Sequence, residues 1–155
     1  MSVTRALYID GEWVETDDSI ENINPSDTTE SLGRYAQATP ALADHAIASA
    51  NRAAKEWGQS PMETRYQMLM AIGTELIDRS AELGELLARE EGKTRAEGVG
   101  EVVRSGQFFH YFAAEVHRQI DDRVDSVRPG IEIETRREPV GVVAVISPWN
   151  FPMAT

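Results

Sequence analysis

Few side chains in this sequence could perform covalent or metal chemistry. No cysteine is present, which excludes disulfides, Cys-x-x-Cys zinc sites and a thiol nucleophile within these 155 residues. His110 and His117 lie about two helical turns apart, whereas metal-binding histidine pairs favour a spacing of about four residues, so we predict no metal site. Asn150, between Trp149 and Phe151, could by itself simply shape a turn. We interpret four glutamates as solvated or helix-capping residues: Glu90, Glu91, Glu97 and Glu101.

The turn that carries Asn150, residues 147–152, follows a strongly apolar segment. Residues 140–146 are rich in β-branched side chains, which is typical of a strand buried on both faces of a parallel sheet. Such a strand needs parallel neighbours and covering helices, and no sequence follows to supply them. We therefore expect the chain to be the first part of a larger α/β protein.

Residues 39–117 have a helical pattern with several start and stop signals. Thr39 and Pro40 are suited to the cap and first position of a helix. Residues 60–63 and 94–97 both have the Ser/Thr-x-x-Glu spacing of a capping box. Between them, a helix that starts after Ser80 is expected to end at Gly92, with Lys93 complementing its dipole.

Short strands are predicted on either side of these helices. Residues 7–14 read as a hairpin around the turn Asp10-Gly11, and residues 32–37 read as a further strand. Residues 131–136 alternate strictly between apolar and polar, as in a strand with one wet face, and Pro129-Gly130 is the turn before it.

The net charge of the chain limits the classes of partner that it can bind. A net charge of -11 disfavours binding to nucleic acid or to anionic membranes. There is no secretory signal and no apolar run of about 20 residues that could cross a bilayer, so a cytoplasmic location is the default. Only Lys55 and Lys93 are lysines among the 15 basic residues, which fits either a salt-adapted protein or ordinary drift toward an acidic pI.

Several motifs, in order along the chain, resemble the aldehyde dehydrogenase superfamily. The most specific is Arg137-Glu138-Pro139-Val140-Gly141 followed by Ser147-Pro148-Trp149-Asn150-Phe151-Pro152. Earlier matches are Ile9-Asp10-Gly11-Glu12-Trp13, Asn24-Pro25, the pattern Trp57, Ser60-Pro61, Arg65, Leu69 and Ile72, and Glu90-Glu91-Gly92-Lys93 with Glu97 and Glu101 beyond it. The resemblance covers essentially the whole chain.

The resemblance implies the N-terminal part of an α/β fold with a helical layer, the start of a Rossmann-type parallel sheet and an oligomerisation arm. Residues 1–38 would form N-terminal strands and turns, and residues 39–120 helices that pack on the nucleotide-binding domain. Residues 121–138 would belong to the arm of a homo-oligomer. Residues 139–155 would form the first buried strand of the nucleotide-binding sheet and the following turn, with the catalytic domain absent.

The resemblance also implies a reaction and a site. In the family, a cysteine thiolate attacks a small-molecule aldehyde, hydride passes to NAD or NADP, and a glutamate-activated water hydrolyses the thioester. By the motif match, the side-chain amide of Asn150 would be a catalytic donor to the oxyanion, a role that suits an uncharged NH₂ group. Ile146, Ser147, Pro148 and Trp149 would line the cofactor.

The catalytic cysteine and glutamate of the family are expected after Thr155, so the 155-residue chain itself is expected to be inactive. The motifs are similar to a subgroup that oxidises 2-oxoglutarate semialdehyde (2,5-dioxopentanoate), with succinate semialdehyde or an aromatic aldehyde as further candidates. The alternative is a non-catalytic interaction protein or decayed gene product, which would bind through its helices or through the strand at residues 131–136.

Overall fold

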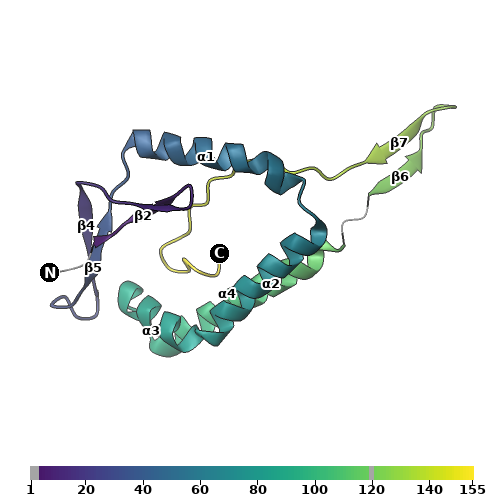
Figure 1. Ribbon diagram of the computed structural model, residues 1–155. Coiled ribbons are helices and arrows are strands. Elements are labelled where there is room, and N and C mark those ends of the chain that lie inside the picture. Colours follow the sequence, from purple (N-terminus) through teal and green to yellow (C-terminus); the bar gives the residue numbers. More distant parts are fainter. Residues whose placement is uncertain (1–3, 119–120) are drawn as a thin grey trace.

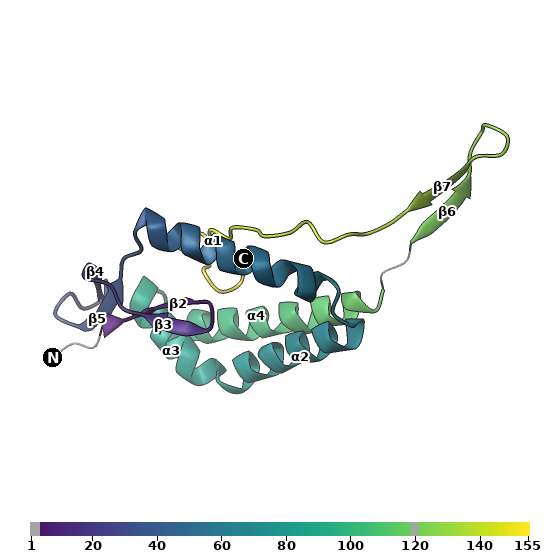
Figure 2. The same cartoon turned by 45° about the horizontal axis from the view of Figure 1, so that its top comes forward.

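The computed structural model describes residues 4–118 and 121–155, and it contains four helices and three small sheets within those ranges. The helices are α1 (Pro40–Gly58), α2 (Met62–Asp78), α3 (Ser80–Glu91) and α4 (Arg95–Val116). Figures 1 and 2 show α2 and α4 side by side, with α1 across from them and the C-terminal segment returning between. The boundary predicted after residue 120 falls on residues 119–120, which lie outside the described residues.

The N-terminal strands form two small sheets, and both predicted elements are confirmed. β2 (Leu7–Ile9) and β3 (Glu12–Val14) form the antiparallel hairpin, in which Asp10 and Gly11 have φ angles of 57° and 83°. Positive φ at both central positions is what a tight hairpin turn requires. The second sheet has the order β1 (Thr4–Arg5), β5 (Ser31–Ala36) and β4 (Ser19–Ile23), and β5 is the strand predicted at 32–37.

Three of the four predicted helix signals are confirmed. The Thr39 hydroxyl accepts a hydrogen bond from the backbone N–H of Leu42 at 3.3 Å. Thr94 and Glu97 form a complete capping box at the start of α4. α3 ends at Gly92, whose φ of 84° places it in the left-handed region.

The capping box predicted at residues 60–63 is wrong. Pro61 occupies the N-cap position of α2, and no side chain caps this helix. The Ser60 hydroxyl instead donates a 2.6 Å hydrogen bond to the carbonyl of Trp57 in the last turn of α1. The physical reason is that the final carbonyls of a helix also lack partners, and Ser60 satisfies one of them rather than an N–H of α2.

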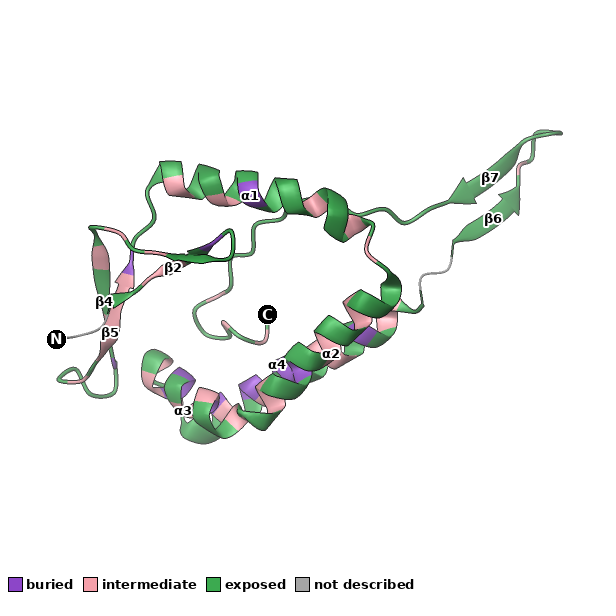
Figure 3. Cartoon of the chain, viewed as in Figure 1, coloured by how far each residue is buried: buried purple, intermediate pink, exposed green. Residues whose placement is uncertain are grey.

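The best-buried part of the chain lies where α4 packs against α2 and α3, as the purple segments of Figure 3 show. Val102 and Ala113 of α4 are fully buried there. The helix backbones approach closely at glycines, since a Cβ on Gly98 would lie 2.3 Å from the carbonyl oxygen of Gly84. This close approach fixes α3 and α4 relative to each other, and with them the turn at Gly92 that joins them.

The hairpin near the C-terminal end, in the region predicted to form the arm, projects away from the helices (Figure 1). The alternating strand is confirmed as β7 (Glu132–Thr135), and its antiparallel partner β6 (Asp122–Asp125) was not predicted. Both faces of β6 and β7 are exposed to solvent. The expected solvent-exposed face is therefore found, but the opposite face is not buried. Gly130, with a φ of 75°, lies in the predicted turn before β7.

Residues 140–146 are not a buried strand in this chain, contrary to the sequence-based expectation. They form an extended segment without strand pairing, in which Val140 and Ile146 are 89% and 94% exposed. Residues 142–144 line a shallow hollow with Ala46, Ile47 and Ala50 of α1. The reason is that a strand requires a neighbour to pair its backbone groups, and no described segment lies beside this one as a strand. That these residues begin a nucleotide-binding sheet stays a prediction.

No helix within the described ranges is long and apolar enough to cross a membrane.

Candidate active site

The loop of residues 149–154 follows the extended segment and consists of turns. It lies beside the α3–α4 junction and carries the last four residues of the Pro-Trp-Asn-Phe-Pro motif, whose first proline is Pro148. Trp149 is 88% exposed, and Asn150 and Phe151 are also exposed. We call residues 149–153 the motif loop.

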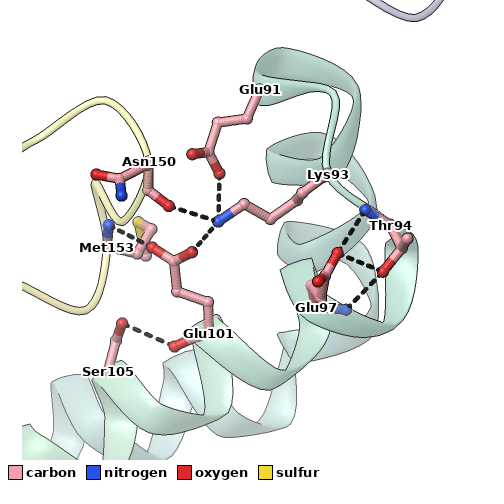
Figure 4. Close-up of polar contacts among 8 residues, drawn as sticks. All are labelled: Glu91, Lys93, Thr94, Glu97, Glu101, Ser105, Asn150 and Met153. Atoms are coloured by element: carbon pink, nitrogen blue, oxygen red, sulfur yellow. Dashed lines mark hydrogen bonds and ion pairs between the residues drawn. The ribbon is translucent and has the colours of Figure 1, made fainter.

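Lys93 connects the motif loop to the helices. Its Nζ donates a 3.0 Å hydrogen bond to the backbone carbonyl of Asn150 and lies 4.8 Å from the centroid of the Phe151 ring. The same ammonium forms ion pairs with Glu91, at 2.6 Å, and with Glu101 (Figure 4). One cation therefore contacts the end of α3, the first half of α4 and the motif loop.

Glu101 completes the connection from the opposite side. One carboxylate oxygen pairs with Lys93, and the other accepts a 2.9 Å hydrogen bond from the backbone N–H of Met153. The Glu101 side chain is only 2% exposed, and that of Lys93 is 13% exposed. A buried carboxylate is costly unless it is paired and hydrogen-bonded, and here both oxygens have partners.

Hydrogen bonds also set the protonation states of two residues in this region. Burial disfavours the charged form of Lys93, but hydrogen bonds from Lys93 to Glu101 and Glu91 outweigh it and raise the pKa of Lys93 above its ordinary value. Hydrogen bonds from the Thr94 hydroxyl and backbone lower the pKa of Glu97. Lys93 is therefore an ammonium, and Glu97 a carboxylate, at neutral pH.

A pocket of about 380 Å³ lies between the α3–α4 junction and the motif loop. Glu91, Gly92, Lys93 and Glu97 line one side, and Trp149, Asn150 and Phe151 line the other. A larger hollow of about 640 Å³ lies at the α1–α2 junction, but no predicted site residue lines it. The smaller pocket is the candidate site because it contains Asn150.

The predicted site residues lie together at this pocket and beside it. Trp149 and Asn150 line it, while Ile146 and Ser147 are exposed on the adjoining segment and Pro148 is half-buried. No group of three or more histidine, aspartate or glutamate residues that could hold a metal occurs in the part of the chain that the structure describes.

Sequence reasoning missed the ionic network that holds the motif loop. Glu97 does cap a helix as predicted, but Glu101 is buried and is not a solvated surface group. Lys93 contacts Glu101 and the motif loop in addition to following Gly92 at the helix end. No local spacing predicts the pair of Lys93 and Glu101, because the two residues are eight positions apart and their shared contact with residues 150–153 depends on the tertiary fold.

Comparison with known proteins defines the class of protein to which this geometry belongs. The aldehyde dehydrogenase family model matches residues 13–155, so the chain belongs to the aldehyde dehydrogenase family. An alpha-ketoglutarate semialdehyde dehydrogenase from Haloferax volcanii is 39% identical over 149 residues, which are 95% of this chain and 31% of that relative. The chain thus spans about a third of the length of this curated relative.

Solved structures have the same fold over this region. A betaine aldehyde dehydrogenase mutant from Staphylococcus aureus, in complex with NAD+, matches with a TM-score of 0.89 and 33% identity, covering 97% of this chain and 31% of that one. An NADP-dependent glyceraldehyde-3-phosphate dehydrogenase from Bacillus halodurans, complexed with NADP, matches with a TM-score of 0.91 and 29% identity, covering 98% of this chain and 33% of that one. The predicted fold class is confirmed.

Proposed function

We propose that this chain is the N-terminal part of an NAD(P)-dependent aldehyde dehydrogenase, and that it supplies one oxyanion donor to the active site. The observation that carries the proposal is the position of Asn150, which lines a pocket on a loop held by a buried ion pair. The family match over residues 13–155 supports it.

Asn150 would act through its side-chain amide. Attack on an aldehyde carbon places negative charge on the carbonyl oxygen, and a preorganised N–H donor stabilises that charge without transferring a proton. The backbone carbonyl of the same residue is fixed by Lys93, which leaves the side-chain amide for the substrate. These 155 residues contain no cysteine that could serve as the thiol nucleophile, so we propose that the chain alone does not oxidise aldehydes.

Residues 146–149 are suited to contact with NAD or NADP. Ile146 and Trp149 expose most of their apolar surface, and residues 146–148 lie outside helices and strands. An aromatic side chain and an accessible backbone are groups that can contact a nicotinamide dinucleotide. When bound, the dinucleotide supplies the hydride acceptor for aldehyde oxidation.

The substrate that we propose is a semialdehyde that carries a carboxylate, such as 2,5-dioxopentanoate. The similarity to the Haloferax volcanii relative, whose name gives that substrate, supports this choice.

For the whole protein we propose a homo-oligomer in which β6 and β7 pair with a neighbouring subunit, because an isolated two-stranded ribbon is marginally stable in water.

The test is the substitution Asn150→Ala in the complete dehydrogenase that contains this chain. Loss of one oxyanion donor lowers kcat by about 10²–10³-fold. The matched control is Asn51→Ala, which removes an exposed asparagine amide from α1 and should leave kcat unchanged. Steady-state rates with 2,5-dioxopentanoate check both variants, and an unchanged kcat in Asn150→Ala would contradict the proposed role.

A further inference from the structure

Glu101 has no direct place in the proposed chemistry, yet it is the most deeply buried carboxylate of the ionic network. Its side chain is 2% exposed, against 11% for Glu91. Burying a carboxylate on a helix opposes folding unless its contacts compensate. The contacts of Glu101 are directed to Lys93 and to the backbone of Met153, and both lead to the motif loop.

The motif loop has few other attachments. The segment before it, residues 137–148, is outside helices and strands, and most of its side chains are exposed. Among the described residues, the hydrogen bonds between residues 149–155 and the rest of the chain are those to Lys93 and Glu101. The cation of Lys93 beside the Phe151 ring adds a further contact at the same place.

Both contacts fix the backbone on the C-terminal side of the Asn150 side chain. Lys93 binds the carbonyl of Asn150 itself, and Glu101 binds the N–H of Met153, three residues later. Figure 4 shows the two charged groups meeting between α4 and the motif loop. Fixing the backbone at both points restricts the orientations that the Asn150 amide can adopt.

We infer that Glu101 is a positioning residue, which acts with Lys93 to hold the motif loop so that Asn150 presents its amide to the reacting oxygen. This inference rests on the proposed function of Asn150. We call Lys93 and Glu101 together the loop clamp.

The chemistry of the clamp predicts a graded series of variants. Glu101→Gln keeps an oxygen that accepts from the Met153 N–H but loses the charge that pairs with Lys93. Glu101→Ala loses both contacts. Because a misplacement of about 1 Å near the reacting atoms can cost about 10²-fold in rate, we expect kcat to fall by about tenfold in Glu101→Gln and about a hundredfold in Glu101→Ala. KM should change much less in both.

A merely structural role is distinguished by a double-mutant cycle in the complete dehydrogenase. If Glu101 acts through Asn150, Glu101→Gln lowers kcat in the native background but has little further effect once Asn150→Ala is present. Glu85→Gln is the matched control, since it removes another glutamate that joins α3 to α4, through a 2.8 Å ion pair with Arg95. It should leave kcat unchanged.

Amide hydrogen exchange keeps the inference testable apart from catalysis. Exchange at the Met153 N–H should accelerate at least tenfold in Glu101→Ala and remain close to the native rate in Glu85→Gln. Lys93→Met, which keeps Glu101 but loses the cation, should also lower kcat. If exchange accelerates in Glu101→Ala but kcat is unchanged in Asn150→Ala, the proposed function of Asn150 is refuted, whereas the contact of the clamp with the motif loop is supported. The positioning role would be overturned if exchange at the Met153 N–H were unchanged in Glu101→Ala. It would also be overturned if the losses in kcat caused by Glu101→Gln and Asn150→Ala multiplied fully in the double variant.

Discussion

Asn150 combines two requirements in one residue. Its backbone carbonyl accepts a hydrogen bond from Lys93, and its side chain lines the pocket. A neutral amide suits this position, because a carboxylate would repel both the developing oxyanion and Glu91 nearby. Beside Asn150, Lys93 neutralises part of the negative charge of Glu91 and Glu101.

A residue-scale prediction concerns the glycines that bring α3 and α4 together. In Gly98→Ala the new Cβ would lie 2.3 Å from the Gly84 carbonyl oxygen, so the helices must separate. Overpacking of this kind costs about 1–3 kcal/mol, which exceeds the helix-propensity gain of about 0.5–1 kcal/mol. We expect a lower free energy of unfolding, measured by chemical denaturation.

The control for that substitution is Gly100→Ala. A Cβ at Gly100 meets nothing within 4 Å, so only the gain in helix propensity remains. Gly100→Ala should therefore be neutral or slightly stabilising. Equal effects of the two substitutions would show that close approach at Gly98 does not determine the packing of α3 on α4.

At the scale of elements, the start of α4 sets the direction of the clamp. The Thr94 hydroxyl accepts from the Glu97 N–H, and the Glu97 carboxylate accepts from the backbone N–H of Thr94. This capping box directly follows Lys93 and begins the helix on which Glu101 lies one turn later. Its geometry therefore determines where the two charged groups of the clamp meet.

Removal of this cap should destabilise the protein more than removal of the Ser60 hydroxyl. Thr94→Ala should lower the free energy of unfolding by about 0.5–2 kcal/mol, the usual cost of losing an N-cap. Ser60→Ala should cost less, because Ser60 caps no helix N-terminus and only donates to the Trp57 carbonyl. Thermal denaturation of both variants checks the order, and a larger loss in Ser60→Ala would contradict it.

The capping box also predicts a pH dependence. Because the pKa of Glu97 is lowered in the folded state, its stabilising contribution is complete above the unfolded pKa of about 4.3 and is lost as pH falls through the lower folded value. The stability difference between the native chain and Glu97→Gln should therefore shrink as the pH drops below about 4. A difference that stayed constant from neutral pH to about pH 3 would rule out this linkage.

Local signals in the sequence predicted most elements because their causes are local. The Asp10-Gly11 turn, the Thr94 capping box and the left-handed Gly92 each depend on residues within one turn of the chain. The same reasoning failed at Ser60, where two helix ends compete for one hydroxyl. It also missed the burial of Glu101, because that depends on a loop about 50 residues later in the chain.

At the scale of the whole molecule, the apolar segment before the motif loop is exposed. Val140, Val143, Val145 and Ile146 are each more than half exposed, although their sequence is typical of a buried strand. The β-branched pattern predicted that these residues need neighbouring strands and helices to bury them. No segment that the structure describes buries them in this way. An exposed extended apolar segment can pair with other chains.

We therefore expect the 155-residue chain to self-associate in solution. The sedimentation coefficient should rise with concentration, and the chain should bind a hydrophobic dye, because the exposed valines offer apolar surface. Replacing Val143 and Val145 together with glutamate should reduce both effects. A native chain that sediments as a monomer at every concentration, with no dye binding, would contradict this expectation.

The most direct measurement of the central claim is aldehyde-dependent formation of NADH or NADPH, made in parallel on the complete dehydrogenase and on the 155-residue chain. The complete enzyme should reduce the dinucleotide when 2,5-dioxopentanoate is added, and the chain alone should form no reduced dinucleotide, since it has no cysteine to serve as nucleophile. Sustained turnover by the chain alone, or no turnover of any aldehyde by the complete protein, would contradict the assignment of this chain to one part of a dehydrogenase active site.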